Sequence, residues 1–163
     1  MQKITPHLWF DRQAEEVANY YISIFKDSKI NNISCYGKEG FEIHKMPEDT
    51  AMTIAFRLEG EDFLALNGGP VFKFNESISF MVNCQDQEEV DYYWDKLTDG
   101  GDPAAQQCGW LKDKFGLSWQ IIPVQLEQLL SDPDATKAGW VMNAMLKMKK
   151  IDVAGLEAAA NQK

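Results

Sequence analysis

The sequence predicts an α+β protein that consists of two βαβββ modules followed by C-terminal helices. Three observations support this fold class. A strand, a helix and further strands occur in the same order twice along the chain, which indicates an internal duplication. The segment EEVANY at residues 15–20 returns as EEVDYY at 88–93, in both cases in the helix after the first strand. After Pro123 the apolar residues recur at helical spacing.

The first module begins with a predicted strand at residues 4–10, ITPHLWF. A helix follows, because apolar residues then recur every three or four positions. These residues are Ala14, Val17, Ala18, Tyr21 and Phe25. Residues 29–37 suit a second strand, and residues 38–49, with glycines and charges, suit a loop. Residues 50–69 have the pattern of a hairpin with its turn at 59–62.

The second module repeats this order. A strand is predicted at residues 77–84 and a helix at 86–101, which ends in glycines after its last turn. Residues 104–124 supply two or three more strands, including a hairpin in GWLKDKFGLSWQIIP at 109–123. The alternation of apolar residues in this hairpin puts a polar residue, Gln120, into an apolar strand.

The C-terminal part is predicted to be helical. The segment QLEQLL forms a short helix, Asp132 and Pro133 begin the next one, and Asp152 caps the last. The methionines of the middle helix, among them Met145, are expected in a core or a subunit contact rather than a binding surface.

These elements divide the chain at two places. The first module covers residues 1–70, the second module 71–124 and a helical extension 125–163. With 163 residues, 45% of them hydrophobic, the chain can bury a sizeable core. We therefore expect the three parts to form one domain, 1–163.

The composition limits the partners and the compartment of the protein. A formal charge of −9 argues against nucleic acid and against anionic membranes as partners. No run approaches the ~20 apolar residues of a membrane span, and MQKITPHLWFDR lacks the apolar segment of a signal peptide. Cys35, Cys84 and Cys108 have no CxxC spacing, so we expect structural, reduced thiols in the cytoplasm.

Three long segments carry a family resemblance. They are ITPHLWFDRQAEEVANYYISIF at 4–25, LALNGGPVFKFNESISFMV at 64–82, and GWLKDKFGLSWQIIP with SDPDATKAGWVMNAMLKMKKIDVAGLEAA within 109–159. The chain resembles the PhnB-like proteins of the vicinal oxygen chelate superfamily, a family labelled 3-demethylubiquinone-9 3-methyltransferase. The superfamily also includes glyoxalase I, bleomycin-resistance proteins and extradiol dioxygenases. The resemblance implies two βαβββ modules around a cleft and a homodimer, with a divalent ion in the cleft of metal-dependent members.

Strand alternation predicts which residues would line such a cleft. A uniformly apolar set is expected to pack under the helices: Ile54, Phe56, Leu58, Leu64, Leu66, Ile78, Phe80 and Val82. The opposite set is mixed: Thr5, His7, Trp9, Thr53, Arg57, Phe63, Ala65, Asn67, Ser77, Ser79, Met81, Ser118, Gln120 and Ile122. An open sheet with one solvent-exposed face would show the same division into an apolar and a mixed set. The cost of exposing Trp9, Phe63 and Met81 favours a cavity.

The ligand positions that the resemblance implies do not favour a tight metal. They correspond to Thr5 or His7, Ala65 or Asn67, Ser77 or Ser79, and Gln120. Only His7 among these is a strong ligand, and no carboxylate occupies them, so little negative charge would offset the dehydration of a cation. If a divalent metal binds, His7 and Gln120 are its expected ligands. His7 is also the candidate general base, because its side chain titrates near neutral pH.

Two functions stay open, and they leave open whether the protein is an enzyme. The first is a small-molecule-binding protein of the bleomycin-resistance type without a tight metal or other cofactor. Its predicted ligand-binding residues are Trp9, Asn67, Ser77, Ser79, Trp119 and Gln120, with Trp110 as a further stacking surface. The second is a metal-assisted isomerase, lyase or dioxygenase that acts on a small organic substrate through His7 and Gln120. The missing carboxylates favour the first.

The methyltransferase label is interpreted as a family name. Enzymes that use S-adenosylmethionine usually have a glycine-rich loop after the first parallel strand of an alternating β/α chain. This sequence instead has runs of antiparallel strands, and Gly68 and Gly69 precede a turn and a strand rather than a helix.

Overall fold

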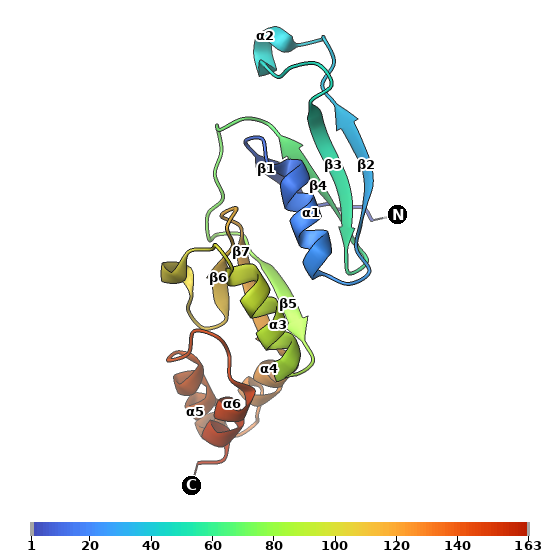
Figure 1. Cartoon of the computed structure of the whole chain (residues 1–163). Helices are drawn as coiled ribbons and strands as arrows, with labels where there is room; N and C mark the ends of the chain where they lie inside the picture. Colours follow the sequence, from blue (N-terminus) through green and yellow to red (C-terminus); the bar gives the residue numbers. More distant parts are fainter. Residues whose placement is uncertain (1, 163) are drawn as a thin grey trace. The chain divides into compact units, whose positions relative to one another are not determined.

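A computed structural model describes residues 2–162 of the chain, which fold into two compact units that divide between residues 73 and 74 (Figure 1). The division falls close to the expected junction of the two modules at residues 70 and 71. The C-terminal helices belong to the second unit. Within the described residues, no helix combines the length and the hydrophobicity that crossing a membrane requires.

The first unit is a four-stranded sheet with a helix along one face (Figure 1). Its elements are β1 (His7–Phe10), α1 (Ala14–Ile24), β2 (Lys29–Cys35), α2 (Phe41–His44), β3 (Ala51–Leu58) and β4 (Glu61–Asn67). The strand order is β1-β4-β3-β2, in which β1 runs parallel to β4 and the other pairs are antiparallel. The core of this unit forms where Val17 and Tyr21 of α1, both fully buried, meet Ile54 and Phe56 on β3.

The expected orientation of β4 is wrong. The β3–β4 register places Phe63 opposite Phe56 and Ala65 opposite Ile54, so even-numbered residues of β3 face odd-numbered residues of β4. Because directly opposite residues share a face, Phe63, Ala65 and Asn67 point to the helix side. Leu64 and Leu66 therefore lie on the open face of the sheet, beside His7 and Trp9 of β1.

Asn67 connects helix α1 to the sheet. Helix α1 follows Gln13, whose side chain makes no capping hydrogen bond. The backbone N–H of Ala14 instead donates to Oδ1 of Asn67 at 2.8 Å, and Nδ2 of Asn67 donates to the Ala51 carbonyl at 2.9 Å. The Tyr36 hydroxyl donates to the Asn67 carbonyl. A buried amide thus replaces the missing local cap and holds the start of the helix on β4.

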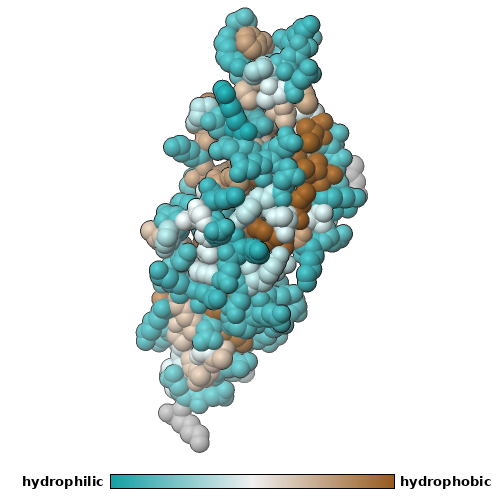
Figure 2. All heavy atoms as spheres, viewed as in Figure 1, coloured by the Kyte–Doolittle hydropathy of each residue, from teal (hydrophilic) through white to brown (hydrophobic). Residues whose placement is uncertain are grey.

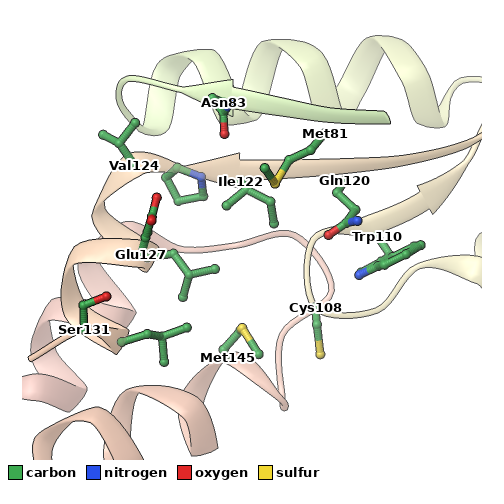
Figure 3. Close-up of a pocket in the computed structure, with 13 residues that line it drawn as sticks. Met81, Asn83, Cys108, Trp110, Gln120, Ile122, Val124, Glu127, Ser131 and Met145 are labelled. Atoms are coloured by element: carbon green, nitrogen blue, oxygen red, sulfur yellow. The ribbon is translucent and has the colours of Figure 1, made fainter. Parts of the chain in front are cut away.

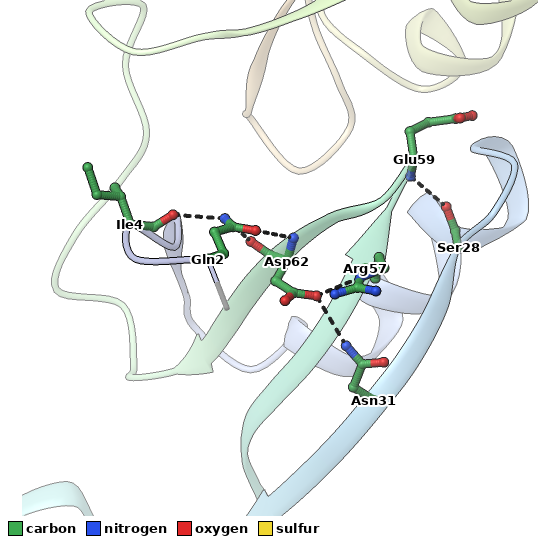
Figure 4. Close-up of polar contacts among 7 residues, drawn as sticks. All are labelled: Gln2, Ile4, Ser28, Asn31, Arg57, Glu59 and Asp62. Atoms are coloured by element: carbon green, nitrogen blue, oxygen red, sulfur yellow. Dashed lines mark hydrogen bonds and ion pairs between the residues drawn. The ribbon is translucent and has the colours of Figure 1, made fainter.

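A second polar group closes the β3–β4 hairpin (Figure 4). The Arg57 Nε donates to Asp62 Oδ1 at 2.7 Å across the hairpin, and Gln2 accepts from the Asp62 N–H at 2.9 Å. The hydrogen bond from Arg57 holds the pKa of the Asp62 carboxyl below its ordinary value. Arg57, expected on the cleft face, is therefore paired within the first unit.

The second unit contains a three-stranded sheet and most of the helices (Figure 1). Its elements are β5 (Phe80–Cys84), α3 (Gln87–Thr98), the 3₁₀ helix η1 (Pro103–Ala105), β6 (Trp110–Lys112), β7 (Ser118–Pro123), α4 (Val124–Leu130), α5 (Ala135–Met145) and α6 (Val153–Ala160). The strand order is β5-β7-β6, with β5 parallel to β7. Helix α3 packs against β7 and β6.

Two details of the second unit differ from the sequence-based expectation. Residues 103–105 form a 3₁₀ turn instead of a strand, because Pro103 begins it and the Asp102 side chain accepts the Ala104 N–H at 2.9 Å. The first strand begins at Phe80, so Ile78 lies before it and is 69% exposed rather than in the core.

The C-terminal helices have a hydrophobic cluster of their own. Its buried members are Leu126, Val141, Ile151, Leu156 and Ala160, and Ile122 of β7 packs against them. Helix α5 is capped by Asp134, whose side chain accepts the Thr136 N–H, whereas Asp132 accepts the Asp134 N–H one turn earlier. The expected start at Asp132 and Pro133 is thus displaced. Helix α6 follows Asp152 as predicted, but the Asp152 side chain makes no capping hydrogen bond. The α+β class with C-terminal helices is confirmed.

Replacement of Asn67 tests the link between α1 and the sheet. We expect Asn67→Ala to lower the free energy of unfolding by about 1–3 kcal/mol, because the Ala14 N–H and the Ala51 carbonyl lose a buried partner. Urea unfolding followed by circular dichroism measures this. The exposed strand residue Asn32 is the matched control, and Asn32→Ala should change stability by less than about 0.5 kcal/mol. Equal effects of the two variants would contradict this role of Asn67.

Candidate functional site

The second unit contains a groove of about 470 Å³ on the face of its sheet that turns away from α3 (Figure 3). Strands β5, β6 and β7 form one side, and helices α4 and α5 contribute the other. Its lining residues are Met81, Asn83, Cys108, Trp110, Gln120, Ile122, Pro123, Val124, Leu126, Glu127, Leu130, Ser131 and Met145. The volume lies in the range of pockets that hold small organic molecules.

Gln120 lies on the groove face, as its alternation with Trp119 predicts. The register places it opposite Met81 on one side and Trp110 on the other. Its Nε2 donates to the Ser79 hydroxyl at 2.8 Å, and its carbonyl oxygen points into the groove (Figure 3). The bond to Ser79 fixes the rotamer, so the amide presents its acceptor to whatever occupies the groove.

Apolar and polarisable side chains form most of the remaining surface. Ile122 of β7 and Leu126 and Leu130 of α4 supply aliphatic walls, and Met81 and Met145 face the groove from opposite sides (Figure 3). Methionine side chains adapt to irregular ligands because they are unbranched and flexible. This composition favours an organic molecule with few polar groups over a strongly hydrated ion.

A buried carboxylate fixes the strand that carries Gln120. Asp113 is 3% exposed, and its Oδ1 accepts the N–H groups of Phe115 and Leu117 at 2.9 and 3.0 Å. Its Oδ2 accepts the indole N–H of Trp119 at 2.8 Å. These bonds shape the β6–β7 turn and hold Trp119 inward. Because neighbouring strand residues face opposite sides, Gln120 is held outward.

Trp119 was predicted to bind the ligand, but the structure places it on the other face of the sheet. It is 3% exposed, and its ring lies 5.6 Å from the ring of Phe80 on the helix side. Trp110, two residues from the start of the hairpin segment, supplies the aromatic surface of the groove instead (Figure 3). Alternation along β7 puts Trp119 on the face opposite Gln120, and the β6–β7 register puts Trp110 on the groove face beside Gln120.

The other predicted site residues have different surroundings. The Ser79 hydroxyl accepts a hydrogen bond from the Gln120 amide, whereas Ser77 is exposed and its N–H donates to the Asn75 side chain. His7 and Trp9 lie on the open face of the first sheet, where His7 is exposed. The Trp9 indole donates to the Gly69 carbonyl at 2.8 Å, and its ring packs on Phe72 at 5.0 Å.

The residues expected to hold a divalent metal do not form a suitable donor set. Asn67, 3% exposed, uses both atoms of its amide within the first unit, and the Gln120 amide nitrogen is bonded to Ser79. In residues 2–162 no three His, Cys, Asp or Glu side chains come close enough together to hold an ion. Neutral amides and hydroxyls with one histidine offset little of the dehydration cost of a divalent cation. These residues are therefore a poor donor set for a divalent cation.

The groove residues from the C-terminal helices were not predicted. Glu127, Leu130 and Met145 lie in elements that the sequence assigns to packing or to subunit contact. The one available signal was that the last strand runs directly into QLEQLL at Pro123, which brings α4 beside the groove face of β7.

Cys108 also lies on the groove, in a loop rather than in a strand. Its φ of 53° and that of Gly109, 84°, are left-handed, and the two N–H groups donate to the Met148 and Lys149 carbonyls. By contrast, Cys84 is fully buried. Burial, and then the charges of Glu89 and Asp86, raises the pKa of the Cys84 thiol to about 12.

Two helix-backed sheets with C-terminal helices, and a groove beside the last strand, define an α+β protein with a pocket of small-molecule size. The model of the 3-demethylubiquinone-9 3-methyltransferase family matches residues 2–122. The chain belongs to this family, whose members include PhnB-like proteins, so the resemblance seen in the sequence is confirmed.

The chain is also similar to several solved structures. The PhnB protein from Bacillus cereus, whose name carries the same methyltransferase label, is 34% identical, with a TM-score of 0.64 over 76% of this chain and 100% of that one. Protein PA1353 from Pseudomonas aeruginosa is 18% identical and shares the fold, with a TM-score of 0.58 over 76% and 98% of the two chains. A glyoxylase/bleomycin resistance protein/dioxygenase domain from Frankia sp. EAN1pec also matches, at 13% identity and a TM-score of 0.44 over 76% and 92%. No curated protein matches the chain.

Replacement of Asp113 tests the turn that orients Gln120. We expect Asp113→Ala to lower the free energy of unfolding by about 3 kcal/mol, because three buried N–H groups lose their acceptor. Urea unfolding monitored by circular dichroism measures the change. Asp99→Ala, at an exposed carboxylate after α3, is the control and should stay within about 0.5 kcal/mol of the wild type. A loss at Asp113 no larger than the control would show that the turn does not depend on this carboxylate.

Thiol labelling tests the assignment of Cys84 as a buried structural residue. In a Cys35→Ser, Cys108→Ser variant, we expect Cys84 to resist Ellman's reagent at pH 8 and to react after unfolding in urea. The reason is that burial excludes the reagent and keeps the thiol protonated. The raised pKa also predicts that this thiol's contribution to stability is present below about pH 8.5 and is lost as the pH rises toward 12. Rapid labelling of the folded variant would refute the assignment.

Proposed function

We propose that the protein binds a small organic molecule in the groove beside Gln120, without a tightly held metal. The observation that carries this proposal is the size of the groove together with the residues that line it. A groove of about 470 Å³ has walls of Ile122, Leu126 and Met145, and the Gln120 amide and the Trp110 indole are among its few polar groups. Pockets of this kind bind organic ligands through buried apolar area and take their specificity from a few polar groups.

The groove supports binding more strongly than catalysis. Its titratable side chains are Cys108 and Glu127, and no histidine is among the lining residues within 2–162. A nucleophile in an active site normally has a base within hydrogen-bond reach. The one recorded side-chain partner of Cys108 is the Gln107 amide, 3.4 Å from its sulfur, and an amide cannot act as that base. His7, the candidate base, belongs to the first unit and does not line this groove.

The methyltransferase label of the family does not extend to the proposed activity. Each sheet of this chain mixes one parallel pair with antiparallel pairs. Gly68 and Gly69 follow β4, but the next element is the strand β5, so there is no helix N-terminus to receive a cofactor's charged group. The methyltransferase label is thus part of the name of the family and of its members. The groove itself favours the binding of a small molecule.

The proposal also includes a homodimer in the cytoplasm. Apolar side chains of the first unit are exposed at Ile33, Val71 and Phe72. Figure 2 shows hydrophobic side chains gathered over β2 and β3. Exposed apolar patches often mark contacts with another protein surface, and a second copy would cover them. Cys35, Cys84 and Cys108 are all free, which suits a reducing compartment.

Filling the groove tests the proposed site. The neutral apolar dye N-phenyl-1-naphthylamine is the probe, and its fluorescence increases when it leaves water. We expect Asn83→Trp, at an exposed groove residue, to weaken dye binding about tenfold, because the indole occupies part of the volume. Gln120→Ala should leave dye binding nearly unchanged, because the dye has little need of the amide's carbonyl.

Asn32→Trp is the matched control for this experiment. Asn32 is an exposed strand asparagine of the first unit and is not part of the groove, so the dye should bind this variant as it binds the wild type. Equal dye affinity in Asn83→Trp and in the control would mean that the groove is not where apolar molecules bind.

A further inference from the structure

The C-terminal helices complete a groove that the family region builds only in part. The family model ends at residue 122, whereas α4 begins at Val124. Seven of the thirteen lining residues lie beyond residue 122, and they include Leu126, Glu127 and Met145. Five of these seven, from Leu126 to Met145, belong to the helical extension at 125–163, so the extension supplies much of the chemistry of the groove.

The extension is held firmly against the sheet of the second unit. The Cys108 and Gly109 N–H groups donate to the Met148 and Lys149 carbonyls at 2.9 and 2.7 Å. Gln87 of α3 donates to the Ile151 carbonyl at 3.1 Å and accepts the Val153 N–H at 2.8 Å. Because the α5–α6 connection is bonded to the module at these four points, this part of the extension has a defined position beside the groove.

Lys150 adds a charged contact to the same connection. Its Nζ lies 2.8 Å from Asp91 and 3.7 Å from Asp95, both on α3. Lys150, one of the lysines of the α5–α6 connection, is therefore paired on α3 instead of being directed into the groove.

The charge of the groove is negative. Glu127 lies in the first turn of α4, on the side of the groove opposite Gln120 and Trp110 (Figure 3). No hydrogen bond or ion pair to its carboxylate is formed within residues 2–162. The lining includes no lysine or arginine, and the chain carries a formal charge of −9. An anionic ligand would meet repulsion here, whereas a cation would find an available carboxylate.

We propose that the C-terminal helices make this groove selective for an apolar molecule that carries one positively charged amine. The inference rests on the proposed function and adds the ligand class. The ammonium group pairs with Glu127, the apolar body packs between Ile122, Leu130 and Met145, and the far end reaches the Gln120 carbonyl. Methionine sulfur and the Trp110 ring are polarisable surfaces that also tolerate a nearby cation.

Three probes of equal shape and different charge test this selectivity. They are 4-phenylbutylamine, 4-phenylbutanol and 4-phenylbutyrate, measured by displacement of N-phenyl-1-naphthylamine. We expect the amine to bind most tightly and the carboxylate most weakly. Glu127→Gln should weaken amine binding about two- to fivefold and leave the alcohol unchanged, which is the size expected for a solvent-accessible ion pair. Added salt should reduce the amine's advantage in the wild type.

Two further variants define the comparison. Glu127→Lys should reverse the order, so that the carboxylate binds more tightly than the amine. Glu157→Gln, at an exposed glutamate of α6 outside the groove, removes the same charge and should leave all three affinities unchanged.

The outcomes separate this inference from the proposed function. Equal displacement by the three probes, or an amine affinity that is the same in the wild type and Glu127→Gln, overturns the charge selectivity and leaves the groove as an apolar site. An equal loss in Glu157→Gln would assign the effect to net charge and would also overturn it. Failure of all three probes to displace the dye, with dye affinity unchanged in Asn83→Trp, overturns the proposed function itself.

Discussion

The carboxylate of Asp113 is the interaction on which the groove depends. A buried charge is costly unless its lone pairs are satisfied, and here two backbone N–H groups and the Trp119 indole satisfy them. The turn that results fixes which face of β7 is inside. Trp119 and Ile121 join the core beneath α3, and Gln120 and Ile122 are left for the groove. The identity of the binding surface thus follows from one hydrogen-bonded turn.

Local pattern was sufficient for most of the fold. The helical spacing of Val17 and Tyr21, and the echo between α1 and α3, predicted both helix-backed sheets, and the apolar pattern after Pro123 predicted the extension. The face of β4 could not be predicted in the same way. Alternation assigns residues to the two faces within one strand. The β3–β4 register decides whether even-numbered or odd-numbered residues of β4 share a face with the even-numbered residues of β3. For that reason Asn67 and Leu66 exchanged their expected sides.

The site was predictable only where it depends on a single strand. Gln120 lies on the expected face because alternation along β7 is enough to place it. The same alternation puts Trp119 on the opposite face. The place of Trp110 depends on the pairing of β6 with β7, and the places of Glu127 and Met145 depend on the packing of α4 and α5 on the sheet. These are tertiary contacts between segments that the sequence separates, and periodicity carries no information about them.

The way in which the extension is anchored has a consequence for how this protein can diverge. Its hydrogen bonds to the rest of the second unit use the backbone carbonyls of Met148, Lys149 and Ile151. A residue of any type at those positions would supply the same carbonyl. The groove-facing residues at positions 127, 130 and 145 make no such anchoring bonds. Substitution at the exposed position 127 can change the bound molecule while the attachment stays intact, whereas Leu130 and Met145 also pack against the hydrophobic cluster of the extension. Position 127 is therefore where the ligand preference of the groove can change with the least effect on stability.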